Sequence, residues 1–393
     1  MASASMSFPD FDVAAFLREY WQKKPLLIRN PWGVWRNPIT PDELAGLACD
    51  EGVESRLIAK RHHDLTLEHG PVPESRFSEL GAEPWTLLVQ AVDHHAPDVA
   101  ALIDPFRFVP NWRVDDVMVS YATDGGGVGA HFDRYDVFLV QGLGKRRWQI
   151  GAICDDDTEL RAHDDLRLLA QFEPTDEWIL EPGDILYVPP LVAHHGVAVG
   201  DDCMTYSIGF RAPAQSELVA HWCEHILDET AESELYRDPD LVLQPNPGEI
   251  SAKALSRLYD MVTAKLLDRD GFALWFGEHN STPKPSDIDW RPEQAVEIDA
   301  LRDWLDAGVP LLRNPASRFS FIRHNTDRII LFVDGQSFDC GGDTIVFAEQ
   351  MCASDRIELV SNATRSPEVE GLILELLNSG SLAFDHDESP EPL

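Results

Sequence analysis

Basic residues are scarce in this chain. Its 393 residues include 32 Lys and Arg against 68 Asp and Glu, which gives a formal net charge of −36. A surface of this sign repels nucleic acid and anionic membranes and attracts basic partners, although acidity also serves simply to keep a protein soluble. The composition therefore argues against a nucleic-acid-binding or membrane-surface protein and leaves a basic protein partner open.

Paired cysteines and long apolar runs are missing as well. The six cysteines are scattered and show no C-x-x-C spacing, which favours reduced thiols in the cytoplasm over a disulfide framework or a thiolate zinc site. No stretch approaches the roughly 18 apolar residues that span a bilayer, and the first residues do not resemble a secretory signal. We therefore expect a cytoplasmic protein with no membrane segment.

Short β-rich runs dominate the chain from about residue 105 to residue 212. They read DVMVSYA, DVFLVQG, RRWQIG, DILYVPP and MTYSIGF, and clusters of Gly, Pro and Asp separate them. Short strands with turns at this spacing predict an antiparallel sandwich or barrel rather than βαβ units. Helical patterns flank this region, among them TPDELAGLA with Thr40 as the expected N-cap, so the predicted fold class is α+β.

Two long amphipathic helical segments follow, at residues 216–236 and 249–278. Their apolar stripes predict burial against a second copy, in a homodimer, or simply against the barrel. The run STPKPSDIDWRP then indicates a linker. We therefore expect three parts, at residues 1–212, 213–280 and 281–393, with the dimer contacts in the second.

The third part mixes helices and short strands in a winged-helix-like order. Many winged helices bind DNA, but residues 291–393 hold 19 Asp and Glu and only 8 Lys and Arg. Contacts to phosphates need cationic side chains. No direct DNA binding is therefore expected.

A candidate metal site begins in the stretch GAHFDRYD, which follows a run of glycines. On a strand, residues two apart face the same side, so His131 and Asp133 are expected to project together. With a third ligand they would form the two-histidine, one-carboxylate triad of non-haem Fe(II) oxygenases, which leaves half of the coordination sphere open. The tripeptide alone fits a solvent-facing polar strand better, but the Gly-rich approach, the β-rich surroundings and a distal histidine after a Pro-Gly-Asp turn favour the metal site.

The third ligand is expected to be His194. It follows the turn and strand EPGDILYVPP, from which an antiparallel strand could return to the first two ligands. Its neighbour His195 is the alternative, since adjacent strand residues face opposite sides.

An oxygenase of this kind needs an electron-rich cosubstrate in addition to O2, and 2-oxoglutarate needs a cation for its distal carboxylate. The run GKRRWQIG supplies candidates. Alternation places Arg146 on the same, apolar side as Trp148, and a guanidinium binds a carboxylate through two hydrogen bonds. Arg146 is therefore the expected 2-oxoglutarate ligand, unless all three cations of the run are solvated on an edge strand.

At these residues the chain resembles a known family. The segments YWQKKPLLIRN, WTLLVQAVDHH, PNWRVDDVMVSYATDGGGVGAHFDRYDVFLVQGLGKRRWQIG, EPGDILYVPPLVAHHG and YSIGFRAP are similar, in order, to the bacterial JmjC-type ribosomal oxygenases. The resemblance is greatest to the ribosomal protein arginine hydroxylases, the ribosomal oxygenase A group. It runs from about residue 10 to residue 275, and the last hundred residues match only in outline.

The resemblance implies a double-stranded β-helix (a cupin or JmjC jelly roll) as the catalytic domain, a helical dimerisation region and an acidic winged-helix-like domain. It implies Fe(II), 2-oxoglutarate and O2, and hydroxylation at C3 of an arginine in the sixteenth large-subunit ribosomal protein, a basic partner. The family's metal ligands fall on His131, Asp133 and His194, and its cosubstrate arginine on Arg146. The chain departs from the family in one loop, where Leu191-Val192-Ala193 replaces Gly-Phe-Pro and His195 replaces Glu.

A substrate arginine needs acceptors for its guanidinium, because an unpaired buried cation is costly. Asp116 and Ser207 are the expected acceptors, and Met118 and Tyr135 are expected to flank the aliphatic stem. The alternatives are a strand-start cap for Asp116 and plain core packing for Met118 and Tyr135.

Other functions fit the same pattern. Related chemistry would hydroxylate a histidine or asparagine, or demethylate a methyl-lysine. From a different class, the chain could be a non-catalytic cupin-fold binding module, although the intact triad argues against it. A seed-storage-like cupin or a sugar-phosphate isomerase fits less well, since their metal sites are commonly richer in histidine.

Overall fold

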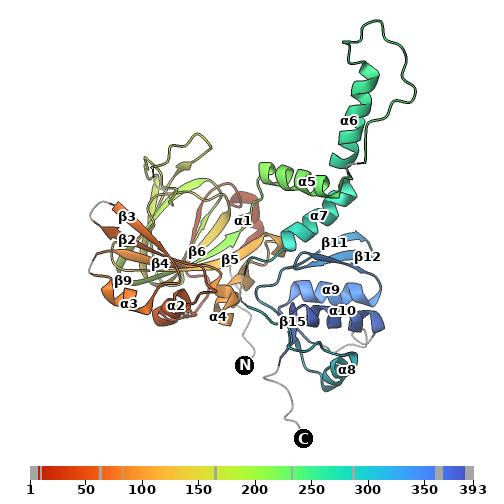
Figure 1. The fold of residues 1–393 in the computed structure, drawn as a ribbon. Helices are drawn as coiled ribbons and strands as arrows, with labels where there is room; N and C mark the ends of the chain where they lie inside the picture. The colour runs from red at the N-terminus through yellow and green to blue at the C-terminus, as the bar shows by residue number, and fades with distance from the viewer. Residues whose placement is uncertain are drawn as a thin grey trace. The chain divides into compact units, whose positions relative to one another are not determined.

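The computed structural model describes residue 8 and residues 11–61, 64–81, 83–162, 166–231, 233–285, 288–358 and 366–385. The chain divides into two compact units. The first contains Met1–Ala212, Lys284–Glu293 and Arg313–Ala316, and the second contains Pro213–Pro283, Gln294–Leu312 and Ser317–Leu393. Each is described by itself below (Figure 1).

The first unit is built on one antiparallel sheet. Its strands follow the order β1-β8-β6-β9-β5-β4-β2-β3, and β7 pairs with β6. Their bounds are β1 Leu26–Ile28, β2 Ser55–Arg61, β3 Asp64–His69, β4 Trp85–Val89, β5 Val114–Ala122, β6 Asp136–Ile153, β7 Asp176–Leu180, β8 Ile185–Val188 and β9 Val192–Phe210. Figure 1 shows how this sheet curls round on itself. The antiparallel arrangement predicted for residues 105–212 is confirmed.

Two details of the predicted strands were wrong. The runs DVFLVQG and RRWQIG, expected as separate strands, form the single strand β6. Its pairing with β9 shifts register between Gln141 and Leu143 and again between Leu143 and Lys145, so an irregularity replaces the expected turn. Strands β2 to β4 also extend the sheet with residues that precede the predicted β-rich region.

Short helices cover the outer face of this sheet. They are α1 Val13–Glu19, α2 Pro41–Ala48, α3 Glu74–Glu79, η1 Val92–His94, α4 Pro97–Ala100, η2 Ala101–Phe106 and η3 Asn111–Arg113. The predicted start of α2 is confirmed: the Thr40 side chain accepts from the Glu43 backbone, and Glu43 accepts from the Thr40 backbone, in a capping box.

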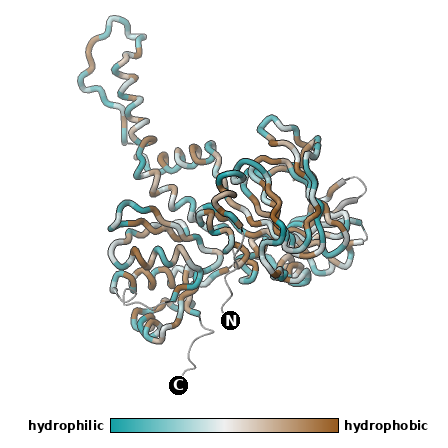
Figure 2. Tube along the Cα trace, turned by 180° about the vertical axis from the view of Figure 1, so that it is seen from behind, coloured by the Kyte–Doolittle hydropathy of each residue, from teal (hydrophilic) through white to brown (hydrophobic). Residues whose placement is uncertain are grey.

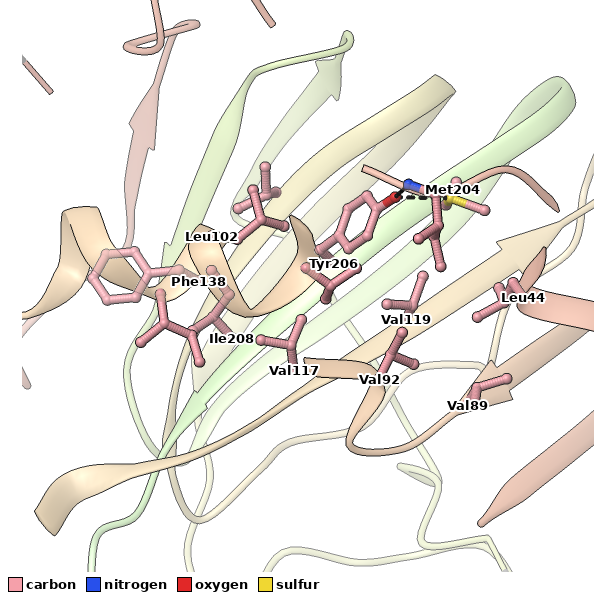
Figure 3. Packing of buried hydrophobic residues seen from close by; sticks show 14 of the residues in the cluster. Leu44, Val89, Val92, Leu102, Val117, Val119, Phe138, Met204, Tyr206 and Ile208 are labelled. Carbon is pink, nitrogen blue, oxygen red and sulfur yellow. Dashed lines mark hydrogen bonds between the residues drawn. The ribbon is translucent and has the colours of Figure 1, made fainter. Parts of the chain in front are cut away.

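The main core lies between these helices and the outer face of the sheet. Figure 3 shows Leu44, Val92 and Leu102 packed against strand residues such as Val117 and Phe138. Alternation along the strands sends the intervening side chains to the inner face, where two smaller apolar clusters and the polar residues of the candidate site lie.

The second unit contains α5 to α10 and two small sheets. The helices are α5 Gln215–Glu229, α6 Ala252–Leu266, α7 Arg269–Ser281, α8 Ile298–Ala307, α9 Asp343–Ala353 and α10 Pro367–Asn378. The strands are β10 Leu311–Arg313, β11 Phe319–Asn325, β12 Arg328–Val333, β13 Gln336–Cys340, β14 Arg356–Ile357 and β15 Leu382–Phe384, with sheet orders β14-β10-β15 and β11-β12-β13. A common core joins α8, α9 and α10 to both sheets, as a winged-helix domain requires.

The second predicted amphipathic segment is two helices rather than one. The chain leaves helical geometry at Leu267, and Asp268 caps the start of α7 by accepting from the Asp270 and Gly271 backbones. Helix α6 has no buried residue and projects from the rest of the unit, and hydrophobic and hydrophilic residues follow one another along it (Figure 2). Within the described residues, no helix combines the length and apolar character needed to cross a bilayer.

Candidate active site

Three of the predicted site residues converge on the inner face of the sheet. His131, Asp133 and His194 each offer one ligand atom, and these atoms lie within 4.8 Å of one another. The Oδ2 atom of Asp133 is 3.4 Å from Nε2 of His194 and 3.9 Å from Nε2 of His131. No other group of three potential ligand side chains with this proximity occurs in the part of the chain that the structure describes.

The backbone brings the two histidines together through one pair of hydrogen bonds. His131 and His194 form an isolated antiparallel bridge, in which each N–H donates to the other's carbonyl at 3.0 and 2.8 Å. Asp133 is not on a strand, contrary to the prediction, because the chain bends after the bridge and β6 begins at Asp136. The Leu191 N–H, which donates to the Asp133 carbonyl at 2.7 Å, ties this bend to the segment that leads into β9.

Both imidazoles are oriented by backbone carbonyls. Nδ1 of His131 lies 2.9 Å from the Gly129 oxygen, and Nδ1 of His194 lies 3.0 Å from the Val192 oxygen. A carbonyl only accepts, so Nδ1 carries a proton in each ring, and Nε2 is the ring nitrogen that lies within 4 Å of Asp133. This is the second layer of contacts that metal-binding histidines require.

The protonation states also suit a cation. Burial and the nearby His194 ring lower the pKa of His131 to about 4, so this ring is neutral at pH 7. Burial alone would raise the pKa of Asp133, but the hydrogen bond from His194 and the two imidazoles outweigh it and lower the pKa to about 2. Burial opposes and Asp133 favours the charged form of His194, and the net result is a raised pKa.

The structure separates the two candidate histidines of the third position. His194 is 2% exposed and lies opposite Ile150 of β6, on the inner face. His195 faces the other way, and its ring lies edge-on to Phe172 with centroids 5.9 Å apart. The convergence of ligand atoms therefore involves His194 and not His195.

Arg146 also lies on the inner face, as alternation predicted. It is 3% exposed, whereas its neighbour Arg147 is exposed on the opposite face. Its Cζ atom is 5.8 Å from the Trp148 ring, and that ring is 5.8 Å from the His194 ring. Arg146 donates to the Ser120 hydroxyl at 3.4 Å, and among the described residues neither an ion pair nor a partner for its Nε is found. A buried guanidinium in this condition requires an anion.

Of the four predicted substrate-binding residues, Tyr135 interacts with the triad, through Asp133. Met118 of β5 is directly opposite Ser207 of β9, and both are less buried than their strand neighbours. Asp116 is buried on the same side of β5. The Tyr135 side chain is 41% exposed, and partial burial together with the charges of Asp133 and Asp116 raises its pKa.

Several residues around Asp116 were not identified from the sequence. The Gln90 amide donates to both oxygens of Asp116 at 2.9 Å, and Lys284 Nζ lies 2.7 Å from Oδ2. Asp93 is buried nearby and accepts from the Val117 N–H at 2.8 Å. Gln90 directly follows β4, Asp93 lies on η1, and Lys284 lies in the run predicted to be a linker. The local sequence around these residues does not indicate a role in the site.

The loop in which the chain departs from the resembling family has a distinctive backbone. Leu191 has φ +66°, a left-handed conformation that glycine adopts readily and leucine does not. It stands at the first position of Leu191-Val192-Ala193, where that family has glycine. The conformation is retained because the Leu191 N–H and the Val192 carbonyl hold Asp133 and His194.

Comparison with known proteins accounts for both units. Residues 101–218 match the family model of the JmjC domain, and residues 264–383 match that of the ROXA-like winged helix. The chain is 34% identical over 384 residues to the ribosomal protein uL16 3-hydroxylase of Escherichia coli strain K12, covering 97% of this chain and 98% of that protein. It is 42% identical over 230 residues to a probable ribosomal oxygenase of Haemophilus influenzae, covering 58% and 54%.

Comparison with solved structures leads to the same family. The X-ray structure of E. coli YcfD matches with a TM-score of 0.86 and 33% identity, over 96% of this chain and 99% of that one. The ribosomal oxygenase YcfD in complex with cobalt and 2-oxoglutarate matches with a TM-score of 0.83 and 32% identity, over 96% and 99%. The fold is therefore the predicted JmjC jelly roll with a C-terminal winged helix, and the chain belongs to the JmjC-type ribosomal oxygenases, which are 2-oxoglutarate-dependent enzymes.

Proposed function

We propose that this protein hydroxylates C3 of an arginine side chain in ribosomal protein uL16, using Fe(II), 2-oxoglutarate and O2. One juxtaposition carries the proposal. The triad His131, Asp133 and His194 lies on the same inner face as Arg146, a buried guanidinium for which no anionic partner is found among the described residues. A metal ion and a dicarboxylate would satisfy both.

The residues present fit Fe(II). Two neutral imidazoles and one carboxylate are the ligand set of non-haem Fe(II) oxygenases, and a triad leaves positions for other ligands. Arg146 fits the distal carboxylate of 2-oxoglutarate, because its Nε is buried without a partner and its guanidinium group can donate two parallel hydrogen bonds to a carboxylate. The Ser120 hydroxyl, which accepts from Arg146 at 3.4 Å and donates to the Thr205 carbonyl at 3.5 Å, lies on the same side.

When bound, the iron and 2-oxoglutarate together use O2 to insert one oxygen atom into a substrate C–H bond, releasing succinate and CO2. The chain supplies geometry. The carbonyls of Gly129 and Val192 hold His131 and His194 in the orientation that a metal needs. The apolar side chains around Trp148 limit water near Arg146, which strengthens its interaction with a carboxylate.

The substrate arginine would be held by its charged end. Asp116 and Ser207 accept from the guanidinium in this proposal, while Met118 and Tyr135 contact the methylene stem. This arrangement leaves the carbon nearer the backbone free to approach the metal, and positioning of this kind is worth many orders of magnitude in rate. Support for the assignment comes from the pairing of Met118 with Ser207 across β5 and β9 and from the electrostatic influence of Asp116 on Tyr135.

The acidic surface favours a ribosomal protein as partner. With a net charge of −36, the chain attracts a basic protein at long range and increases the rate of encounter. The relative in E. coli is named for uL16. We infer that this chain meets the corresponding protein in the cytoplasm, where ribosomal proteins are made.

Mass spectrometry of uL16 after turnover tests the proposed reaction. Purified protein, Fe(II), 2-oxoglutarate and recombinant uL16 should yield one succinate per uL16 and a mass gain of about 16 Da on a single arginine. The D133A variant is the matched control and should give neither product. Addition of 16 Da to a histidine or asparagine, or loss of about 14 Da from a methyl-lysine, would replace the arginine assignment. No succinate under any condition would indicate a binding module.

We also propose a homodimer formed through α6. This helix carries an exposed apolar row, and a row of this kind on an isolated helix is normally covered. Its members are Leu255, Leu258, Tyr259, Met261, Val262 and Leu266. Analytical ultracentrifugation should find a dimer for the wild type and for S256E, but a monomer for L258E/V262E. A monomeric wild type would contradict the proposal.

A further inference from the structure

The acceptor proposed for the substrate guanidinium already holds a cation from the same unit. Lys284 Nζ lies 2.7 Å from Oδ2 of Asp116 and 3.0 Å from Oδ2 of Asp115. Arg211 approaches Asp115 from another side, at 3.7 Å, and Asp116 has no second cation within ion-pair distance among the described residues. Lys284 is therefore the charge that neutralises Asp116.

The carboxylate of Asp116 has little capacity left. The Gln90 amide donates to Oδ1 and Oδ2, and Lys284 adds a third hydrogen bond at Oδ2. A carboxylate offers about four lone-pair positions, and a guanidinium fork occupies two of them, one on each oxygen. A bidentate guanidinium and Lys284 therefore compete for the same edge of Asp116.

Lys284 is the partner more easily displaced. Its side chain is 35% exposed, and its backbone lies outside any helix or strand. Gln90 is held more firmly, because its backbone N–H donates to the Glu54 carbonyl at 2.9 Å and its amide oxygen accepts from Arg56 at 3.4 Å. A lysine that swings into solvent regains full hydration at its ammonium group.

We propose that Lys284 occupies the guanidinium site of Asp116 in the substrate-free enzyme and is displaced when the substrate arginine enters. This inference rests on the proposed function, since the role of Asp116 belongs to it. Without Lys284 the substrate-free enzyme would bury Asp116 beside Asp93 with no positive charge, a costly arrangement. Lys284 thus neutralises and orients the acceptor, at the expense of substrate affinity.

Titration with a small arginine ligand tests the exchange. The full-length protein, loaded with Mn(II) and N-oxalylglycine at pH 8, is titrated with N-acetyl-arginine N-methylamide, and the Kd is measured by calorimetry or NMR. Loss of one partly solvated, charge-assisted competitor should make K284M bind about five- to tenfold more tightly than the wild type. K284R should bind the arginine ligand more weakly than the wild type does, because the guanidinium of the introduced side chain can form two hydrogen bonds with Asp116 and so competes better than an ammonium group.

Two controls separate displacement from a general change in charge. K145M removes an exposed lysine paired with Glu181 on the outer face and should leave the Kd unchanged. The uncharged ligand N-acetyl-citrulline N-methylamide should not distinguish K284M from the wild type. Weaker or unchanged arginine binding by K284M, or wild-type binding by K284R, would overturn the proposal, because a purely structural lysine predicts loss in the first variant and rescue in the second.

The D116N variant distinguishes the two levels of the proposal. If D116N abolishes arginine binding and K284M fails to tighten it, the displacement is wrong and the role of Asp116 stands. If D116N binds the arginine ligand as the wild type does, the substrate site itself has been misplaced.

Discussion

The Nε2 atom of His194 lies 3.4 Å from the Oδ2 atom of Asp133, and His131 completes the group from the opposite side of a single β-bridge. Each of the three side chains comes from a different local setting: a bridge residue, a bend and a strand. The convergence of their donor atoms on the inner face of a jelly roll is the basis of the functional account.

Removal of the carboxylate should weaken metal binding strongly. In D133A two imidazoles remain, and the affinity for Mn(II) should fall by about a hundredfold or more, since loss of even an outer contact costs about 10- to 100-fold. Isothermal titration calorimetry with Mn(II) measures this directly. D156A is the control: Asp156 is an exposed carboxylate paired with Arg134, and its removal should leave the affinity for Mn(II) unchanged.

Arg146 should contribute to 2-oxoglutarate binding and should not stabilise the ligand-free fold. In R146M the KM for 2-oxoglutarate should rise by about 10- to 100-fold, as expected for loss of a charge-assisted hydrogen-bonded pair. The same change should raise the free energy of unfolding of the ligand-free protein by about 1 kcal/mol, because a buried unpaired charge is removed. R147M, altered on the exposed face, should change neither quantity. An unchanged KM in R146M would exclude Arg146 as the cosubstrate ligand.

Stability should depend on pH through Asp93. Burial and the charge of Asp116 raise its pKa to about 7, while Lys284 opposes the shift and His94 lies 3.9 Å away. An acid whose pKa is raised in the folded state contributes stability below its unfolded pKa of about 4, and this stability is lost as the pH rises through about 7. Between pH 5 and pH 8 the wild type should therefore lose about 3 kcal/mol relative to D93N. Parallel urea curves for the two proteins would contradict the raised pKa.

The left-handed backbone at Leu191 predicts an unusual order of stabilities. L191G and L191A both remove the side chain, but only glycine relieves the positive φ. The free energy of unfolding of L191G should therefore exceed that of L191A by about 1 kcal/mol. At most positions the order is the reverse, because glycine gives the unfolded chain more conformational freedom than alanine does. Chemical denaturation of both variants measures the difference. A higher free energy of unfolding for L191A than for L191G would contradict the positive φ of Leu191.

Period-two alternation explains how much of the site could be predicted. Whether Arg146 or Arg147 faces inward, and whether His194 or His195 does, depends only on the geometry of a single strand. Both choices could therefore be made from a few neighbouring residues. The turn before β8 and the capping box at Thr40 are likewise local, since their hydrogen bonds join residues three apart.

The remainder of the site depends on contacts between residues far apart in the sequence, which local sequence patterns do not predict. Lys284 meets Asp116 across 168 positions of sequence, and Gln90 meets it across 26. Asp133 reaches the metal position from a bend rather than from the expected strand, and the hydrogen bond from Leu191 that ties this bend joins two segments far apart in the chain. Such contacts exist only once the sheet has closed, so sequence periodicity could not reveal them.

A crystal structure grown with Mn(II) and N-oxalylglycine is the most direct test of the central claim. The account predicts one Mn(II) ion bound by Nε2 of His131, a carboxylate oxygen of Asp133 and Nε2 of His194, at about 2.0–2.2 Å, with the distal carboxylate of the inhibitor on Arg146. An ion bound elsewhere, or His194 turned away from it, would contradict the account.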